Sequence, residues 1–136
     1  MTRYNTNLAA EFYVLSMLHR LGIDASLTLG NKKAVDIVVA YEDGTLSTIE
    51  VKGLEKRYDW PADNIKEFEK SRHFYVLVSF EGKIEDPLTP PNAWIIPANK
   101  LAQFRKQYKT RIVISNSLVR SQGEQFKNNW KIITSP

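Results

Sequence analysis

Residues Lys32 to Gly53 read KKAVDIVVAYEDGTLSTIEVKG, and this stretch decides the fold. It contains two apolar runs rich in β-branched residues, Ala34–Ala40 and Thr45–Gly53, on either side of an Asp-Gly pair. An Asp-Gly pair between two such runs is a strong signal for a β-hairpin. We therefore predict that two adjoining strands form the centre of a sheet.

One acid interrupts the first of these strands. The run Ala34–Ala40 is apolar except for Asp36, which is typical of a strand that is buried on both faces, where an unpaired carboxylate is costly. Side chains alternate along the second strand, so Glu50 and Lys52 share one face beside the strand that carries Asp36. Two acids and a lysine that converge in an apolar sheet predict a functional site.

The length and composition limit the class of protein. The 136 residues suit a single domain, residues 1–136. A formal net charge of +4 gives a mild bias toward polyanions, and the absence of cysteine excludes disulfides and thiolate metal sites. We find neither the apolar core of a secretory signal nor an apolar run of membrane-spanning length, so we expect a cytoplasmic protein with no membrane partner.

The N-terminal part predicts a helix followed by a strand. Asn7 is a candidate N-cap for a helix over Leu8–Leu21, and Gly22 would end it. Its expected inward stripe consists of Leu8, Phe12, Leu15, Leu18 and Leu21. A strand over Ile23–Leu29 and a turn at Gly30-Asn31 lead into the central hairpin.

The remaining elements complete a mixed sheet with helices on its faces. We expect a loop over residues 54–59, a helix over 63–71, a strand over 73–80, a loop over 81–92, a strand over 93–96, a helix over 99–108 and a strand over 111–115. The tail has a mixed character, with packing anchors at Leu118-Val119, Phe126 and residues 130–133.

The acid in one strand followed by Glu50-Val51-Lys52 on the next resembles the signature of the PD-(D/E)XK nucleases. The resemblance extends over Leu8–Phe80 and implies an α/β fold with a restriction endonuclease-like core of order αβββαβ, in which helices flank a mixed central sheet. The chain would be a small member of that superfamily. It departs from the pattern in having Val35 where a proline often precedes the first acid. It also has no Gln-x-x-x-Tyr element after Lys52, so we do not place it in the exonuclease-like branch.

The resemblance implies hydrolysis of DNA phosphodiester bonds with Mg²⁺, or Mn²⁺ as a substitute. Asp36 and Glu50 would be carboxylate ligands, and the backbone carbonyl of Val51 would be a further ligand. Lys52 would orient or deprotonate the attacking water and offset charge in the transition state. Glu11, on the first helix, would be an additional acid that binds a second metal or holds a metal-bound water.

Basic residues flank the proposed catalytic strands. Lys32 and Lys33 precede the strand of Asp36, and Lys56 and Arg57 follow the second strand, so both pairs are candidate contacts to nucleic-acid phosphates. Because one such site cuts one strand, cleavage of a duplex would favour a homodimer, and the small size also suits a subunit of a larger DNA-processing complex.

Each of these residues also has a plainer explanation. Glu50 and Lys52 could form an exposed ion pair of little energetic weight, and Asp36 could be a hydrogen-bonded core acid. Glu11 could simply be favoured by the dipole in the first turn of its helix. The basic residues could be solvated loop charges.

Two other functions remain open at this point. One is a catalytically inactive module on the same fold that binds nucleic acid or a partner protein, and the other is an enzyme acting on a different phosphoester, such as a small nucleotide. The sequence does not separate DNA from RNA. His19 and His73 are expected to be structural, as is Trp60, which we interpret as a packing anchor.

Overall fold

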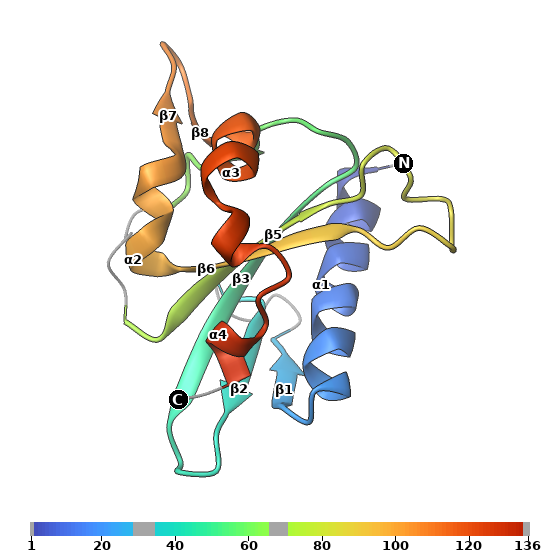
Figure 1. Ribbon diagram of the computed structural model, residues 1–136, viewed down its shortest axis with the longest axis vertical. Coiled ribbons are helices and arrows are strands. Elements are labelled where there is room, and N and C mark those ends of the chain that lie inside the picture. Colours follow the sequence, from blue (N-terminus) through green and yellow to red (C-terminus); the bar gives the residue numbers. More distant parts are fainter. Residues whose placement is uncertain (1, 29–34, 66–70, 135–136) are drawn as a thin grey trace.

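A computed structural model describes residues 2–28, 35–65 and 71–134 and shows a mixed α/β architecture (Figure 1). Its main sheet contains β1 (Asp24–Leu27), β2 (Ile37–Ala40), β3 (Leu46–Leu54), β5 (His73–Ser79) and β6 (Asn92–Pro97). The strand order is β1-β2-β3-β5-β6. β3 and β5 run parallel, whereas the other neighbours are antiparallel, so the prediction of a mixed sheet is confirmed.

The central hairpin is also confirmed. β2 pairs with β3 in a register that sets Ile37 opposite Ile49, and Gly44 adopts a φ of 85° in the connecting turn. The first strand is shorter than expected, because it begins at Ile37. Only alternate residues of β2 are buried, because Val38 and Ala40 point away from the face that packs in the core. The prediction that this strand is buried on both faces was therefore wrong.

Helix α1 (Arg3–Arg20) covers one face of the main sheet (Figure 1). It begins five residues before the predicted start, because the N-cap is Thr2, whose side chain accepts a hydrogen bond from the amide of Asn5. Its buried face consists of Thr6, Ala10, Val14 and Leu18. Of the predicted stripe, Leu18 is buried and Leu15 packs against the core while partly buried, whereas the prediction was wrong at Phe12 and Leu21.

Small residues set the buried face of α1 because the helix lies very close to β3. A Cβ added to Gly53 would lie 2.6 Å from the Cβ of Ala10, so neither position has room for a larger side chain. The larger residues point elsewhere: Phe12 is 53% exposed and Leu21 is 48% exposed.

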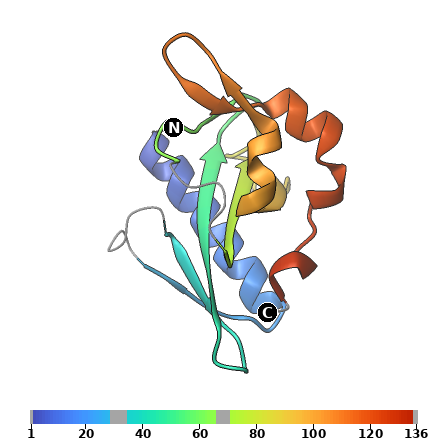
Figure 2. The same ribbon diagram turned by 90° about the vertical axis from the view of Figure 1, so that its left-hand side faces the viewer.

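A second layer covers the other face of the main sheet. It contains a small sheet of order β4-β8-β7, formed by β4 (Trp60–Pro61), β8 (Ile112–Ile114) and β7 (Arg105–Gln107), together with α2 (Ala98–Leu101) and α3 (Asn116–Gln122). These elements bury Trp60, Leu101, Phe104, Ile114 and Val119 against Tyr75, Leu77, Trp94 and Ile96 of β5 and β6. Figure 2 shows α2 and α3 on the side of the sheet away from α1 and the β7–β8 hairpin above the end of the sheet.

The predicted helix over residues 99–108 was wrong in its second half. α2 ends at Leu101, the 3₁₀ helix η1 (Ala102–Phe104) follows, and residues 105–107 then form β7. Leu101 and Phe104 are buried as expected, but Arg105–Gln107 pairs with β8, so strand pairing replaces the helical turn. Neither this small sheet nor β4 was predicted.

The C-terminal segment forms α3, the 3₁₀ helix η2 (Glu124–Phe126) and α4 (Lys131–Thr134). The predicted anchors Val119, Phe126, Trp130 and Ile133 are buried. The turn predicted at residues 30–31 and most of the helix predicted over 63–71 lie outside the described residues. No helix in the described part of the chain has the length and apolar character needed to cross a membrane.

Candidate functional site

The site lies at an edge of β3 that β2 leaves uncovered. The β2–β3 pairing stops at Ile37 and Ile49, while β3 continues to Leu54. Just before β2, the amide of Asp36 donates to the carbonyl of Ile49 at 2.8 Å. Asp36 Oδ2 accepts a hydrogen bond from the amide of Val51 at 2.7 Å. The side chain of Asp36 thus provides the acceptor that a backbone carbonyl would provide if the pairing of β2 with β3 continued.

Backbone alternation directs the Val51 carbonyl toward the same edge. Along a strand, the N–H and C=O of one residue point to the same side, and successive residues alternate. The carbonyl of Leu54 accepts from Phe80 on the β5 side, whereas the amide of Val51 faces Asp36. The peptide groups of Val51 and Gly53 therefore both face the uncovered edge.

Glu50 and Lys52 form an ion pair on one face of β3, as the alternation predicted. Lys52 Nζ lies 2.7 Å from Glu50 Oε2, and the two side chains are only 12% and 9% exposed, respectively. Across the sheet they are in register with Leu77 and Tyr75 of β5. The explanation as an exposed surface pair is therefore wrong.

A pocket of about 430 Å³ brings the predicted catalytic residues together. Its lining includes Asp36, Glu50, Lys52 and Glu11. Val51 and Gly53, whose peptide groups face this edge of β3, also line it. The other lining residues are Arg3, Asn7, Leu54, Pro61, Asp63 and Asn64. The pocket thus lies between the first half of α1, the end of β3 and the segment that follows β4.

Two acids in this pocket hold their protons more tightly than usual. Burial, followed by the charge of Asp36, raises the pKa of Glu11 from 4.5 to about 7. Burial also raises the pKa of Asp36, with a further contribution from the charge of Glu50, although the hydrogen bond from the Val51 amide opposes the rise. Burial is therefore the main reason why these two acids resist ionisation, and repulsion from a neighbouring carboxylate adds to it.

The position of Glu11 corrects the helix-dipole explanation. Because α1 begins at Arg3, Glu11 lies in its middle, and the first turn contains no acidic residue. The dipole effect falls off within the first turn and cannot account for an acid here. What Glu11 does have is a place on the pocket wall, close enough to Asp36 for the two charges to interact.

The donor set suits Mg²⁺ better than a transition metal. Within residues 2–28, 35–65 and 71–134, no three His, Cys, Asp or Glu side chains gather into a metal-binding group. Mg²⁺, however, is usually held by one or two carboxylates and keeps several waters. Asp36, Glu50 and the Val51 carbonyl, all hard oxygen donors on one pocket, meet that requirement.

Of the predicted phosphate contacts, Lys32 and Lys33 lie outside the described residues. Lys56 and Arg57 are exposed in the loop that follows β3. The Arg57 side chain is 66% exposed, and its Nε donates to Glu81 Oε2 at 2.6 Å.

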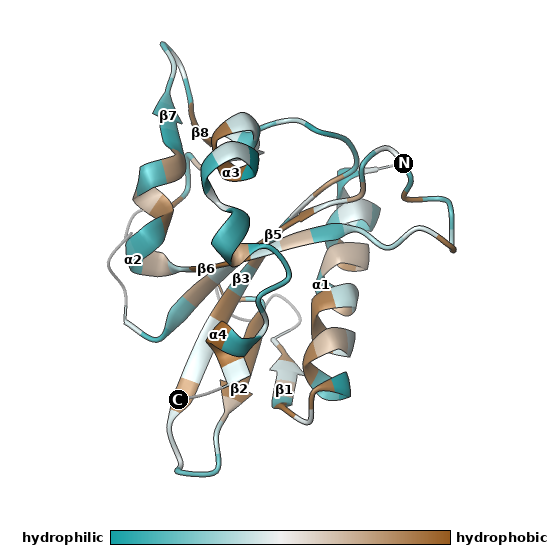
Figure 3. Ribbon diagram, viewed as in Figure 1, coloured by the Kyte–Doolittle hydropathy of each residue, from teal (hydrophilic) through white to brown (hydrophobic). Residues whose placement is uncertain are grey.

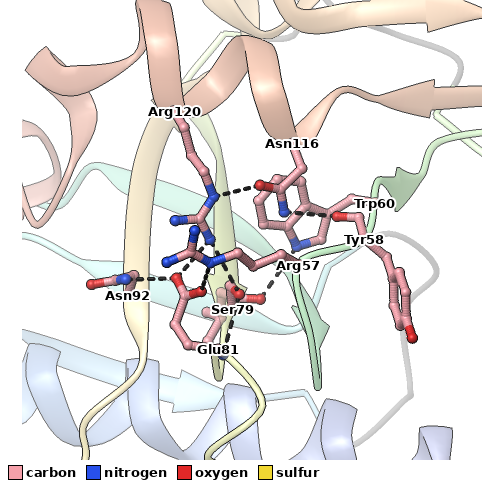
Figure 4. A network of polar contacts seen from close by, with 9 residues as sticks. Arg57, Tyr58, Trp60, Ser79, Glu81, Asn92, Asn116 and Arg120 are labelled. Atoms are coloured by element: carbon pink, nitrogen blue, oxygen red, sulfur yellow. Dashed lines mark hydrogen bonds and ion pairs between the residues drawn. The ribbon is translucent and has the colours of Figure 1, made fainter.

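A polar network that the sequence analysis did not predict holds this loop in place (Figure 4). Glu81 lies just beyond β5, and its Oε1 accepts hydrogen bonds from Arg120 and Asn92, each at 2.6 Å. Burial alone would raise the pKa of Glu81, but the hydrogen bonds from Arg120, Asn92 and Arg57 outweigh it and lower the pKa to about 2. The network ties the loop after β3 to α3 and to the ends of β5 and β6.

Sequence reasoning missed the pocket residues outside the signature. Arg3 and Asn7 precede Glu11 at intervals of four residues, the spacing that places side chains on one helix face, so a helix starting at Arg3 would have indicated them. Asp63 accepts a hydrogen bond from the amide of Ile112 at 2.6 Å, a contact between segments far apart in the sequence.

The two histidines have structural contacts, as expected. His19 Nε2 lies 2.9 Å from the carbonyl of Ala25, and His73 Nδ1 lies 2.7 Å from Thr48 Oγ1. Trp60 is fully buried, and its Nε1 donates to the carbonyl of Val78 at 3.3 Å, which confirms it as a packing anchor.

Comparison with known proteins gives no match: no protein-family model, curated protein or solved structure is significantly similar to this chain. The functional argument therefore rests on the pocket and its contacts.

Proposed function

We propose that this protein is a metal-dependent nuclease of the PD-(D/E)XK type that hydrolyses DNA phosphodiester bonds. The observation that carries the proposal is the meeting of Asp36, Glu50, Lys52 and Glu11 around one pocket at the uncovered edge of β3. The order α1-β1-β2-β3, followed by β5 parallel to β3, supports a restriction endonuclease-like core.

Asp36 and Glu50 would hold the metal ion together with the carbonyl of Val51. When bound, Mg²⁺ supplies positive charge to phosphoryl oxygens and lowers the pKa of a coordinated water. Burial is the main cause of the raised pKa of Asp36, and the nearby charge of Glu50 adds to it. A bound cation would offset both effects, because it favours the ionised carboxylate.

Lys52 supplies a fixed positive charge at the reacting phosphate. Its ion pair with Glu50 and its low exposure hold the ammonium group in one place, so little reorganisation is needed when negative charge develops. Nζ can donate a hydrogen bond to the attacking water or to a phosphate oxygen. Glu11, with a pKa of about 7, can take up or release a proton at neutral pH.

The substrate contacts proposed outside the pocket are phosphate contacts. Lys56 and Arg57 follow directly on β3, and Glu81 fixes the Arg57 side chain so that its exposed guanidinium faces solvent. Such residues position the backbone of a nucleic acid without reading its sequence. Cleavage of both strands would require two pockets, as in a homodimer or a larger DNA-processing complex.

The test is degradation of plasmid and single-stranded DNA with Mg²⁺ or Mn²⁺. We expect Asp36→Ala and Lys52→Ala to lower the rate by about 100-fold or more, the usual range for acid–base and charge-stabilising groups. Asp24→Asn and Lys131→Ala, at exposed positions outside the pocket, are the matched controls and should retain the wild-type rate. Equal residual activity in all five proteins would rule out the proposal.

A binding module without catalysis is the second candidate. The ion pair between Glu50 and Lys52 favours it, because each of these buried charges has its partner without a metal ion. In that case calorimetric titration with Mn²⁺ would show no binding that depends on Asp36, and DNA affinity would survive Asp36→Ala.

A further inference from the structure

The hairpin formed by β7 and β8 carries an unusual concentration of positive charge. Residues 105–111 read RKQYKTR, with four basic residues and no acidic one. Their combined formal charge equals the net charge of the whole chain, +4. All seven residues are exposed.

The hairpin projects from the body of the molecule as a narrow ribbon (Figures 1 and 2). The amide of Tyr108 donates to the carbonyl of Arg111 at 2.8 Å and closes the turn at its tip. Each arm of the ribbon extends about three residues past the last pair between β4 and β8, or roughly 10 Å at the usual rise per strand residue. Figure 3 shows β7 as hydrophilic.

The base of the hairpin is joined to the wall of the pocket. Pro61, which lines the pocket, pairs with Val113 of β8. Asp63, on the same wall, accepts a hydrogen bond from the amide of Ile112. Val113 and Ile114 are buried, so the base is fixed while the charged tip stands in solvent.

We propose that the β7–β8 hairpin is an arm that binds the phosphate backbone of duplex nucleic acid and guides it to the pocket. The choice of partner rests on the proposed function, since the same charge would attract other polyanions. Lys106, Lys109 and Arg111 have no ion-pair partner among the described residues, so their charges are available to phosphates. A two-stranded ribbon also fits the major groove of B-DNA, which is about 12 Å wide.

Protection of a sheet edge is the plainer explanation of these charges. β7 is the edge strand of the small sheet, and lysines on edge strands discourage pairing with other chains. Charge of either sign would serve that purpose. Binding to phosphates requires positive charge, so the two explanations predict different results for charge reversal.

The test compares Lys106→Gln/Lys109→Gln with Arg20→Gln/Lys131→Gln. All four residues are exposed, and each double variant lowers the net charge by two. Affinity for a 20-base-pair duplex is measured by fluorescence anisotropy in EDTA from 50 to 200 mM salt. The loss of two phosphate contacts should make the negative slope of log K against log salt shallower by about 1.8. The fold-loss of affinity between 50 and 200 mM salt should therefore be about tenfold smaller in this variant than in the wild type.

The control variant should keep a slope within about 0.5 of the wild type. Equal changes in both variants would mean that only net charge matters and would overturn the proposal, as would the absence of duplex binding by the wild type. Tighter binding to phosphatidylserine vesicles than to the duplex would also overturn it. Lys106→Glu/Lys109→Glu should leave the oligomeric state of the protein unchanged but bind the duplex more weakly still. Unchanged binding by this variant would overturn the proposal in favour of edge protection.

This experiment is independent of catalysis, because EDTA removes the metal ion. If the nuclease proposal fails while the arm is real, the duplex still binds through the hairpin, and Asp36→Ala leaves that affinity intact. If the arm fails while the nuclease is real, the hairpin variant cleaves DNA and binds Mn²⁺ as the wild type does.

Discussion

Replacement of Glu11 by glutamine should stabilise the protein at alkaline pH. The folded protein keeps the proton of Glu11 up to a pKa of about 7, whereas the unfolded chain releases it near 4.5. Between these values the folded state binds more protons than the unfolded state, so the free energy of unfolding falls as the pH rises. Glutamine removes this titration and hence the loss of stability.

The magnitude follows from the size of the pKa rise. At about 1.36 kcal/mol per pH unit, a rise from 4.5 to about 7 sets a ceiling of about 3 kcal/mol. Glu11 is only half-buried, and solvent screening weakens its repulsion from Asp36. We therefore expect Glu11→Gln to gain about 1 kcal/mol over the wild type at pH 8 and much less at pH 5.

Urea denaturation in EDTA at pH 5 and pH 8 measures this difference. Glu85→Gln, at an exposed position outside the pocket, is the matched control and should stay within about 0.5 kcal/mol of the wild type at both pH values. If Glu11→Gln is equally or less stable than the wild type at pH 8, then burial and the charge of Asp36 do not disfavour the ionised form of Glu11 as described.

Three further predictions concern the framework that holds the pocket. Glu81→Gln should lose about 2 kcal/mol at pH 7, below the ceiling set by a pKa of about 2 because its partner Arg57 is largely exposed. Since the folded pKa is lowered, this contribution is present above pH 4.5 and is lost as the pH falls toward 2. Urea denaturation of wild type and variant across that pH range would measure it, and the same loss of stability with falling pH in both proteins would contradict it. Gly53→Ala should destabilise the protein by about 1 to 3 kcal/mol, because the new Cβ would lie 2.6 Å from that of Ala10, and chemical denaturation of this variant should give a lower midpoint than the wild type. Trp60→Ala should cost about 3 to 5 kcal/mol, since it empties a fully buried site, and a thermal midpoint within a few degrees of the wild type would refute the packing described here.

The central hairpin and the convergence of the candidate catalytic residues could be predicted because their signals are local. The Asp-Gly turn fixes the β2–β3 hairpin, and alternation along β3 fixes Glu50 and Lys52 on one face. These relations need only the geometry of a strand and its neighbour. The position of Asp36 beside Val51 follows from the same hairpin register.

The features of the fold that could not be predicted depend on contacts between segments far apart in the sequence. The burial of Ala10 in place of Phe12 is set by the close approach of α1 to Gly53, which no periodicity in the helix reveals. β7 forms where a helix was expected because β8 offers a partner for Arg105–Gln107. The Glu81 network likewise unites residues from four regions of the chain, each unremarkable in its own sequence context.

The most direct test of the central claim is a crystal structure of the protein soaked with Mn²⁺, with the ion located by its anomalous scattering. We predict one ion at the uncovered edge of β3, coordinated by carboxylate oxygens of Asp36 and Glu50 and by the carbonyl of Val51. An ion bound elsewhere, or no ion in this pocket at millimolar Mn²⁺, would contradict the account.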